Sequence, residues 1–155
     1  MMDQLQGTDF APLQALIRLF PLGILSGRGC VLPHLAEAHP GRRAGGRWIG
    51  LRAVPTECIR GTASTTGSRG QDFKPVRGRA PADWATRWSR LLSAVDEQVI
   101  LPPVQLIRAA GDYWVIDGHN RVALARERGQ LWIDAEITEF DLGPGRDAAA
   151  AAKEN

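Results

Sequence analysis

The clearest helical pattern in the chain runs from Pro81 to Val95. Its apolar residues recur at intervals of three and four, which places them on one face of an α-helix, and proline is well tolerated in a first turn. Tryptophans at this spacing favour a core role over base stacking. We therefore expect a helix over 81–95 that lies on a sheet through Trp84, Trp88, Leu91, Leu92 and Val95.

Four other segments carry the residues and the alternation of β-strands. Two of them, 104–108 and 113–117, are joined by a hairpin-length connection that contains Gly111. The last alternates apolar and polar residues, as a half-exposed strand does. Together the predicted elements make an α+β domain, a small mixed β-sheet with packed helices, whose strands lie at 48–55, 104–108, 113–117 and 133–140.

The strand at 113–117 leads directly into a tight turn and a second helix. Gly118 gives the turn its backbone freedom, the helix is expected to begin at about His119, and Gly129 stands where a left-handed C-cap belongs. The first turn of such a helix leaves N–H groups unpaired at the positive end of the helix dipole. The segment therefore predicts an anion site.

Four side chains at this turn add chemistry to the bare amides. Arg121 lies within reach of an anion, and His119 and Asn120 offer further donors. The negative charge of Asp117 would repel a phosphate bound without a metal ion. Its carboxylate either caps the helix by accepting from the N–H of Asn120, the ordinary structural reading, or binds a Mg²⁺ ion that a phosphate shares.

A second candidate region, 60–74, is rich in glycine, serine and threonine and has no apolar period. Its small residues let backbone N–H groups approach an anion closely, and we assign Arg60, Thr62, Ser64 and Arg69 to ligand binding. The same composition also suits a flexible linker. Between residues 60 and 90 the chain holds seven cations and two carboxylates, which indicates either a DNA-facing surface or a solvated loop.

The N-terminal part, 1–47, is read as a helix over about 8–20 followed by an irregular extension, and 141–155 as a flexible tail. The apolar run at 10–25 contains Arg18 and is too short to span a membrane. We therefore expect the predicted helix to pack on the main domain or to contact a second copy of the chain, as a homodimer, or another protein. At 155 residues the chain predicts one domain over 48–140. Two isolated cysteines favour a reducing cytoplasm.

The run Ile-Asp-Gly-His-Asn-Arg-Val-Ala-Leu-Ala-Arg at 116–126 resembles the signature of the ParB/sulfiredoxin-like superfamily, in its Asp-Gly-His-His-Arg form. The upstream segments at 50–59 and 101–106 are similar to that family's first strand and to the strand before the signature. The resemblance implies that the turn and helix N-terminus bind nucleotide phosphates. Members include CTP-binding partition proteins, ATP-using sulfiredoxins and free serine kinases.

This chain departs from those members in ways that change the expected chemistry. Sulfiredoxins have a cysteine where His119 stands, so no thiol is present for their reaction and that activity is excluded. The chain ends too soon after Phe140 for the DNA-binding helices of partition proteins. A kinase needs a carboxylate base, for which the loop offers only Asp72.

Three functions remain open from the sequence. The first is a nucleotide-binding module for ATP, ADP or CTP with Mg²⁺, with or without NTPase or kinase-like activity carried by His119, Asp117 and Asp72. It would bind phosphates through Gly118, His119, Asn120 and Arg121, with Asp117 near the metal. The second is a DNA-associated partition-type or regulatory module. The third is a non-catalytic scaffold that acts through protein contacts.

Overall fold

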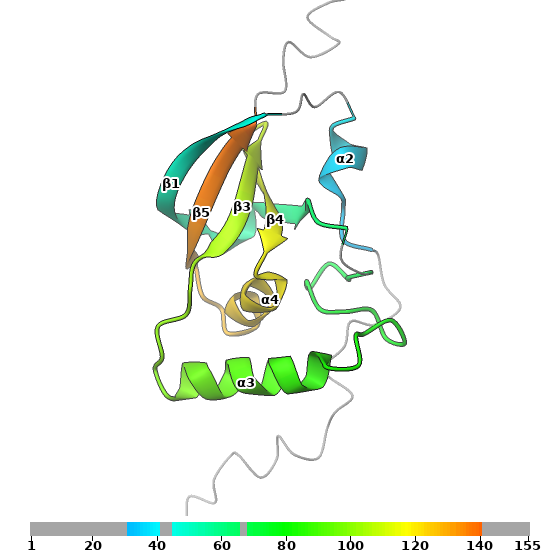
Figure 1. Ribbon diagram of the computed structural model, residues 1–155, viewed down its shortest axis with the longest axis vertical. Coiled ribbons are helices and arrows are strands. Elements are labelled where there is room, and N and C mark those ends of the chain that lie inside the picture. Colours follow the sequence, from blue (N-terminus) through cyan, green and yellow to red (C-terminus); the bar gives the residue numbers. More distant parts are fainter. Residues whose placement is uncertain (1–30, 41–44, 66–67, 141–155) are drawn as a thin grey trace, which may run out of the picture.

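The computed structural model describes residues 31–40, 45–65 and 68–140, and Figure 1 shows a twisted sheet with the longer helices at one end of it and a short helix beside it. The strands are β1 (Gly46–Pro55), β2 (Ile59–Thr62), β3 (Val104–Ala109), β4 (Asp112–Asp117) and β5 (Trp132–Phe140). The helices are α2 (Leu35–Ala38), the 3₁₀ turn η2 (Thr56–Cys58), α3 (Trp84–Asp96) and α4 (His119–Glu127). The predicted α+β class is confirmed.

The sheet is mixed and has the strand order β1-β5-β3-β4-β2. β1 pairs antiparallel with β5, and β3 antiparallel with β4, whereas the β3–β5 and β2–β4 pairs are parallel. The β3–β4 hairpin turns on two residues, Ala110 and Gly111, which both have positive φ, as a type I′ turn requires. The four predicted strands are present, and the predicted hairpin is confirmed with a shorter turn.

β2 is a strand that was not predicted from the sequence, which indicated a loop from residue 60 onward. Its residues pair with β4 through Ile59 and Tyr113 and through Gly61 and Trp114, so its order comes from a partner far along the chain. Gly61 lets the backbone at Pro33 approach, because a Cβ there would lie 2.2 Å from the Pro33 carbonyl oxygen. Because its order comes from these distant contacts, this short strand has no alternation of apolar residues by which the sequence could reveal it.

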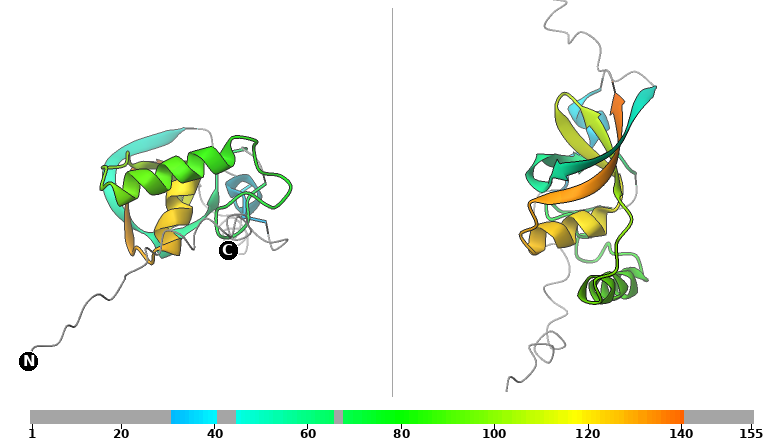
Figure 2. Two further views of the ribbon diagram at one scale, coloured as in Figure 1. Left: turned by 90° about the horizontal axis from the view of Figure 1, so that it is seen from below. Right: turned by 90° about the vertical axis from the view of Figure 1, so that its left-hand side faces the viewer.

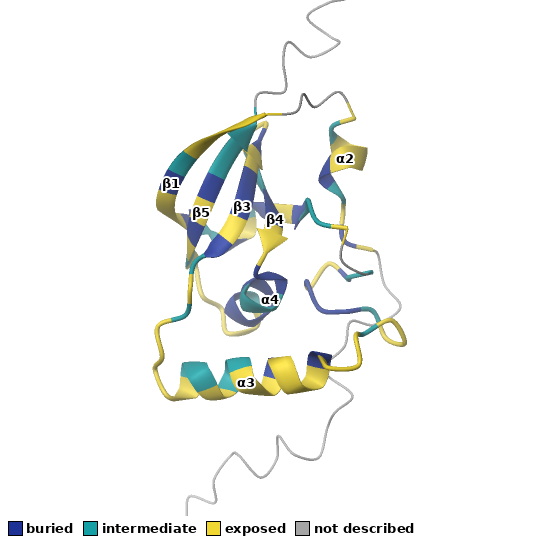
Figure 3. Cartoon of the chain, in the orientation of Figure 1, coloured by how far each residue is buried: buried dark blue, intermediate teal, exposed yellow. Residues whose placement is uncertain are grey.

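α4 lies between the sheet and α3, and α3 crosses it on the outer side (Figures 1 and 2). Figure 3 shows α4 buried on nearly every side, and Val122, Ala123, Leu124 and Ala125 are all buried, as a helix covered on two faces must be. The prediction that α3 lies directly on the sheet was therefore wrong. Its predicted stripe does face inward, since Trp84 and Trp88 are buried and their rings stack, but the helix begins at Trp84 rather than Pro81.

The C-terminus of α4 ends as the sequence predicts. Gly129 has φ +67°, the N–H of Gln130 donates to Ala125 and that of Gly129 donates to Arg126. These two bonds define a Schellman motif. The helix is therefore fixed in length by its own sequence.

Residues 31–40 pack on the domain, although the sequence reading placed them in an extension. Leu32 and Leu35 are buried, and the N–H of Leu32 donates to the carbonyl of Arg69. The helix predicted over 8–20 and the tail at 141–155 lie outside the described residues. Within those residues, no helix is long and apolar enough to cross a membrane.

Candidate functional site: an arginine-lined cavity at the start of α4

A cavity of about 720 Å³ opens at the N-terminus of α4. One wall is the turn from Asp117 to Arg121, and the opposite wall comes from the loop before α3 and from α3 itself. Four arginines line it, and Asp117 is the one carboxylate among its described residues. The cavity therefore has a net positive charge, although two of the arginines also pair with carboxylates. The arginines are Arg69, Arg79, Arg87 and Arg121.

The N-cap of α4 is Gly118, in a left-handed conformation with φ +97°. No side chain caps this end, and among the described residues no acceptor meets the N–H groups of His119, Asn120 and Arg121. A helix start without a cap leaves these donors and the positive end of the helix dipole directed at whatever fills the space ahead. All three residues and Gly118 line the cavity, so this end suits an anion.

Asp117 does not cap the helix, which corrects that reading of the sequence. Its Oδ2 lies 2.6 Å from Arg121 Nη2, while Arg121 Nη1 donates to the carbonyls of Pro102 and Pro103. The Arg121 guanidinium is thus held on three acceptors and its side chain is only 16% exposed. Arg121 neutralises Asp117 and fixes the wall of the cavity, so its role is to hold the turn in shape rather than to offer a free donor.

Asn120 joins three elements at the site. Its Oδ1 accepts from Arg69 Nη1 at 3.1 Å and from Trp84 Nε1 at 3.1 Å. Arg69 also donates to the carbonyl of Phe73 at 2.7 Å. One amide oxygen therefore connects the loop before α3, the start of α3 and the first turn of α4. Because that oxygen is already occupied, the group of Asn120 that can meet a ligand is its backbone N–H.

His119 is buried beneath the cavity, 5% exposed. Its Nε2 lies 2.8 Å from Thr62 Oγ1, and Thr62 Oγ1 accepts from the N–H of Ser64 at 3.0 Å. Burial, and secondarily the nearby Arg69, lower the pKa of His119 to about 4, against a smaller opposing effect of Asp117. The ring is thus neutral at physiological pH and links β2 to α4.

Arg79 and Arg87 were not singled out as site residues by the sequence reading. Arg79 Nη1 donates to Ser68 Oγ at 2.9 Å, and Arg87 pairs with Asp83, the residue just before its helix, at 2.6 Å in an exposed contact. Such exposed contacts contribute little to stability and exchange readily. The one sequence signal for these two arginines was the excess of cations over 60–90.

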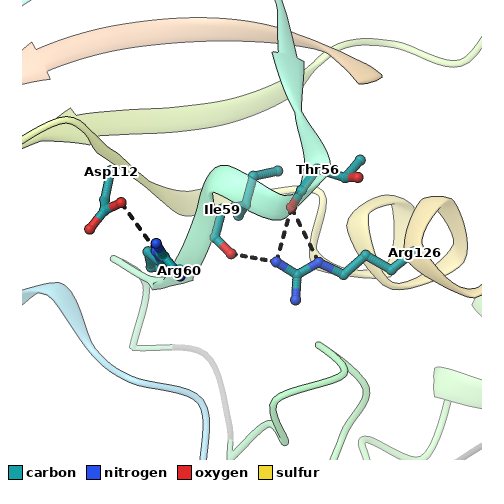
Figure 4. A network of polar contacts seen from close by, with 5 residues as sticks. All are labelled: Thr56, Ile59, Arg60, Asp112 and Arg126. Carbon is teal, nitrogen blue, oxygen red and sulfur yellow. Dashed lines mark hydrogen bonds and ion pairs between the residues drawn. The ribbon is translucent and has the colours of Figure 1, made fainter. Parts of the chain in front are cut away.

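Two predicted site residues lie elsewhere. Arg60 pairs with Asp112 at 3.1 Å, beside Arg126, which donates to the carbonyls of Thr56 and Ile59 (Figure 4). That network lines a separate cavity. Asp72 accepts from the N–H of Lys74 in a local turn and does not line the arginine-lined cavity. Neither residue can act on a ligand at the start of α4.

The other predicted residues of the loop reach the site in different ways. Ser64 and Arg69 line the cavity, whereas Thr62 touches it only through His119 and Ser64. Lys74 pairs with Glu127 at 2.7 Å. Arg69 and Lys74 make contacts inside the fold, whereas Arg60 is exposed, and binding of DNA by the cations of 60–90 stays a prediction from the sequence.

The described residues do not fit a metal ion held by the protein alone. They contain no group of three or more histidine, cysteine or acidic side chains placed to hold one. Asp117 is already paired with Arg121. The role of Asp117 as a magnesium ligand therefore stays a prediction from the sequence.

Comparisons with known proteins add one structural likeness. No family model and no curated protein matches the chain. Among solved structures, the crystal structure of sulfiredoxin from Arabidopsis thaliana is similar, with a TM-score of 0.41 and 16% sequence identity over 66% of this chain and 97% of that chain. A likeness this distant does not establish an activity for this chain.

Proposed function

We propose that the cavity at the start of α4 binds the phosphate groups of a nucleotide. The observation that carries the proposal is the uncapped first turn of α4, which opens into a cavity lined by four arginines. Bare helix-terminal N–H groups and guanidinium groups are both donors that proteins use to bind phosphate.

The electrostatics of the arginines support an anionic ligand. Burial, and secondarily the like charge of Arg87, lower the pKa of Arg69. Two guanidinium groups close enough to affect each other are stabilised by an anion between them. Arg79 and Arg87, held by exposed contacts, can turn to that anion at little cost.

The same cavity has room and a surface for a nucleoside. Its apolar lining comes from Pro75, Pro81, Leu91, Leu101, Pro102 and Ile116. Its volume of about 720 Å³ lies within the range of small-molecule sites. We therefore propose phosphates at the first turn of α4 and the base and sugar against the apolar wall.

We propose binding alone, because no described residue that lines the cavity is placed as a general base. His119 is buried and bonded to Thr62, Asp117 is paired with Arg121, and Asp72 lies outside the cavity. A general base must lie within hydrogen-bond reach of the proton that it abstracts. ATP, ADP and CTP remain the candidate ligands.

Arg87→Gln is expected to weaken nucleotide binding by about ten- to a hundredfold, because a charge-assisted hydrogen bond contributes about 1.5–3 kcal/mol. Isothermal titration calorimetry with ATP, ADP, CTP and inorganic pyrophosphate, each with and without Mg²⁺, measures this. The matched control is Arg90→Gln, an exposed arginine of the same helix that does not line the cavity. No heat with any of these ligands, or equal losses in both variants, would rule out the proposed site.

A further inference from the structure

The loop that brings Arg69 to the cavity is closed as a tight hairpin. Arg69 and Pro75 form an antiparallel bridge, the N–H of Gly70 donates to the carbonyl of Lys74, and the N–H of Phe73 donates to that of Gly70. Such a three-residue hairpin loop ends on a left-handed residue, for which glycine is favoured. Residue 73 is instead a phenylalanine with φ +64°. A Cβ strains this conformation, so the reason for the phenylalanine lies in its side chain.

The ring of Phe73 is held from two sides. It is fully buried in the hydrophobic core, and the Arg126 guanidinium lies 4.7 Å from its centroid. Arg126 is itself fixed, because it donates to the carbonyls of Thr56 and Ile59 (Figure 4). A residue stays in an unfavourable backbone conformation only where its surroundings hold it there. The packing of the ring therefore fixes the backbone of residue 73.

We propose that Phe73 is a positioning residue for the cavity: its buried ring aims its own carbonyl at Arg69 and so holds the Arg69 guanidinium beside the first turn of α4. Arg69 Nη1 donates to this carbonyl at 2.7 Å and to Asn120 Oδ1 at 3.1 Å. A donor that is ordered before the ligand arrives loses less conformational entropy on binding. The gain in affinity rests on the proposed phosphate binding, whereas the order of Arg69 in the free protein does not.

The order of Arg69 can be measured without any ligand. In protein labelled with ¹⁵N-arginine, rotation about the Nε–Cζ bond is slow for a held guanidinium and fast for a solvated one. Arg69→Lys assigns the signal by its loss, and Arg90 is an exposed reference. Wild type should show slow rotation at Arg69 and fast rotation at Arg90. Equally fast rotation at both would overturn the proposal, whether or not the protein binds phosphate.

Phe73→Gly removes the ring and gives the turn the residue that its backbone favours. Rotation at Arg69 should then become as fast as at Arg90, and the affinity for inorganic pyrophosphate, measured by calorimetry, should fall about tenfold. Phe73→Ala gives the same comparison with the turn still strained. An Arg69 that stays ordered in these variants would show that the turn alone aims the carbonyl, and would overturn the proposal.

Leu106→Ala is the matched core truncation, because Leu106 is as fully buried as Phe73 but lies on β3 and does not line the cavity. It should lower stability while leaving the rotation rate of Arg69 and the pyrophosphate affinity within twofold of wild type. Phe73→Leu, which keeps a buried side chain at the turn, should do the same. Equal loosening of Arg69 by Leu106→Ala and Phe73→Ala would show that Phe73 is only a core residue. A wild type that binds no pyrophosphate but holds Arg69 through Phe73 would refute the phosphate site and leave the positioning intact.

Discussion

Replacing Gly118 by alanine is expected to lower the free energy of unfolding by about 3 kcal/mol. Gly118 has φ +97°, and a Cβ there would lie 2.6 Å from Val104 Cγ1. Val104 is fully buried at the start of β3, and a close-packed interior leaves it little space to shift into. A left-handed residue with a Cβ costs about 1–2 kcal/mol, and overpacking a core adds about 1–3 kcal/mol. Urea unfolding followed by tryptophan fluorescence measures the change.

Gly129→Ala is the matched control at the other end of the same helix. Gly129 has φ +67°, but a Cβ there would meet nothing within 4 Å. It should cost only the backbone penalty, about 1–2 kcal/mol. Equal losses in the two variants would show that the close approach of Gly118 to Val104 does not constrain the turn that forms the site.

The protein is also expected to lose about 3 kcal/mol of stability between pH 6.5 and pH 4 through His119 alone. The fold holds the pKa of His119 at about 4, whereas its ordinary value is 6.5. Between these values the unfolded chain binds a proton that the folded chain does not. Stability from this group is therefore fully present above pH 6.5 and is lost as the pH falls, at about 1.4 kcal/mol for each pH unit between the two values.

His119→Gln isolates this contribution, because glutamine does not titrate and can still meet Thr62. The variant should be less stable than wild type near neutral pH, and the gap should close as the pH falls toward 4. Urea unfolding of both proteins across this range gives the comparison. Two stability curves that stay parallel from pH 7 to pH 4 would show that the ring is protonated as easily in the fold as outside it.

Local sequence was enough to predict the helix start at His119 and the end at Gly129. These features depend on residues within a few positions of one another: a glycine free to adopt positive φ at each end and helix-forming residues between them. The β3–β4 hairpin was predictable for the same reason. Where the determinant is local, the sequence pattern and the structure agree.

The features that the sequence did not predict depend on distant partners. Arg121 binds the carbonyls of Pro102 and Pro103, which no spacing within its own helix indicates. β2 is ordered by β4, and Asn120 is positioned by Arg69 and Trp84. Arg79 and Arg87 enter the cavity because the loop and α3 come to lie opposite α4. In each case the tertiary fold, rather than local propensity, brings the groups together.

The most direct test of the central claim follows the backbone amide resonances of the ¹⁵N-labelled protein while ADP with Mg²⁺, or inorganic pyrophosphate, is added. If an anion binds at the uncapped start of α4, the signals of His119, Asn120 and Arg121 shift together and saturate. The amide of Arg60, in the separate cavity, should stay in place. First-turn amides that do not move at millimolar ligand, or shifts confined to Arg60 and its neighbours, would contradict the account.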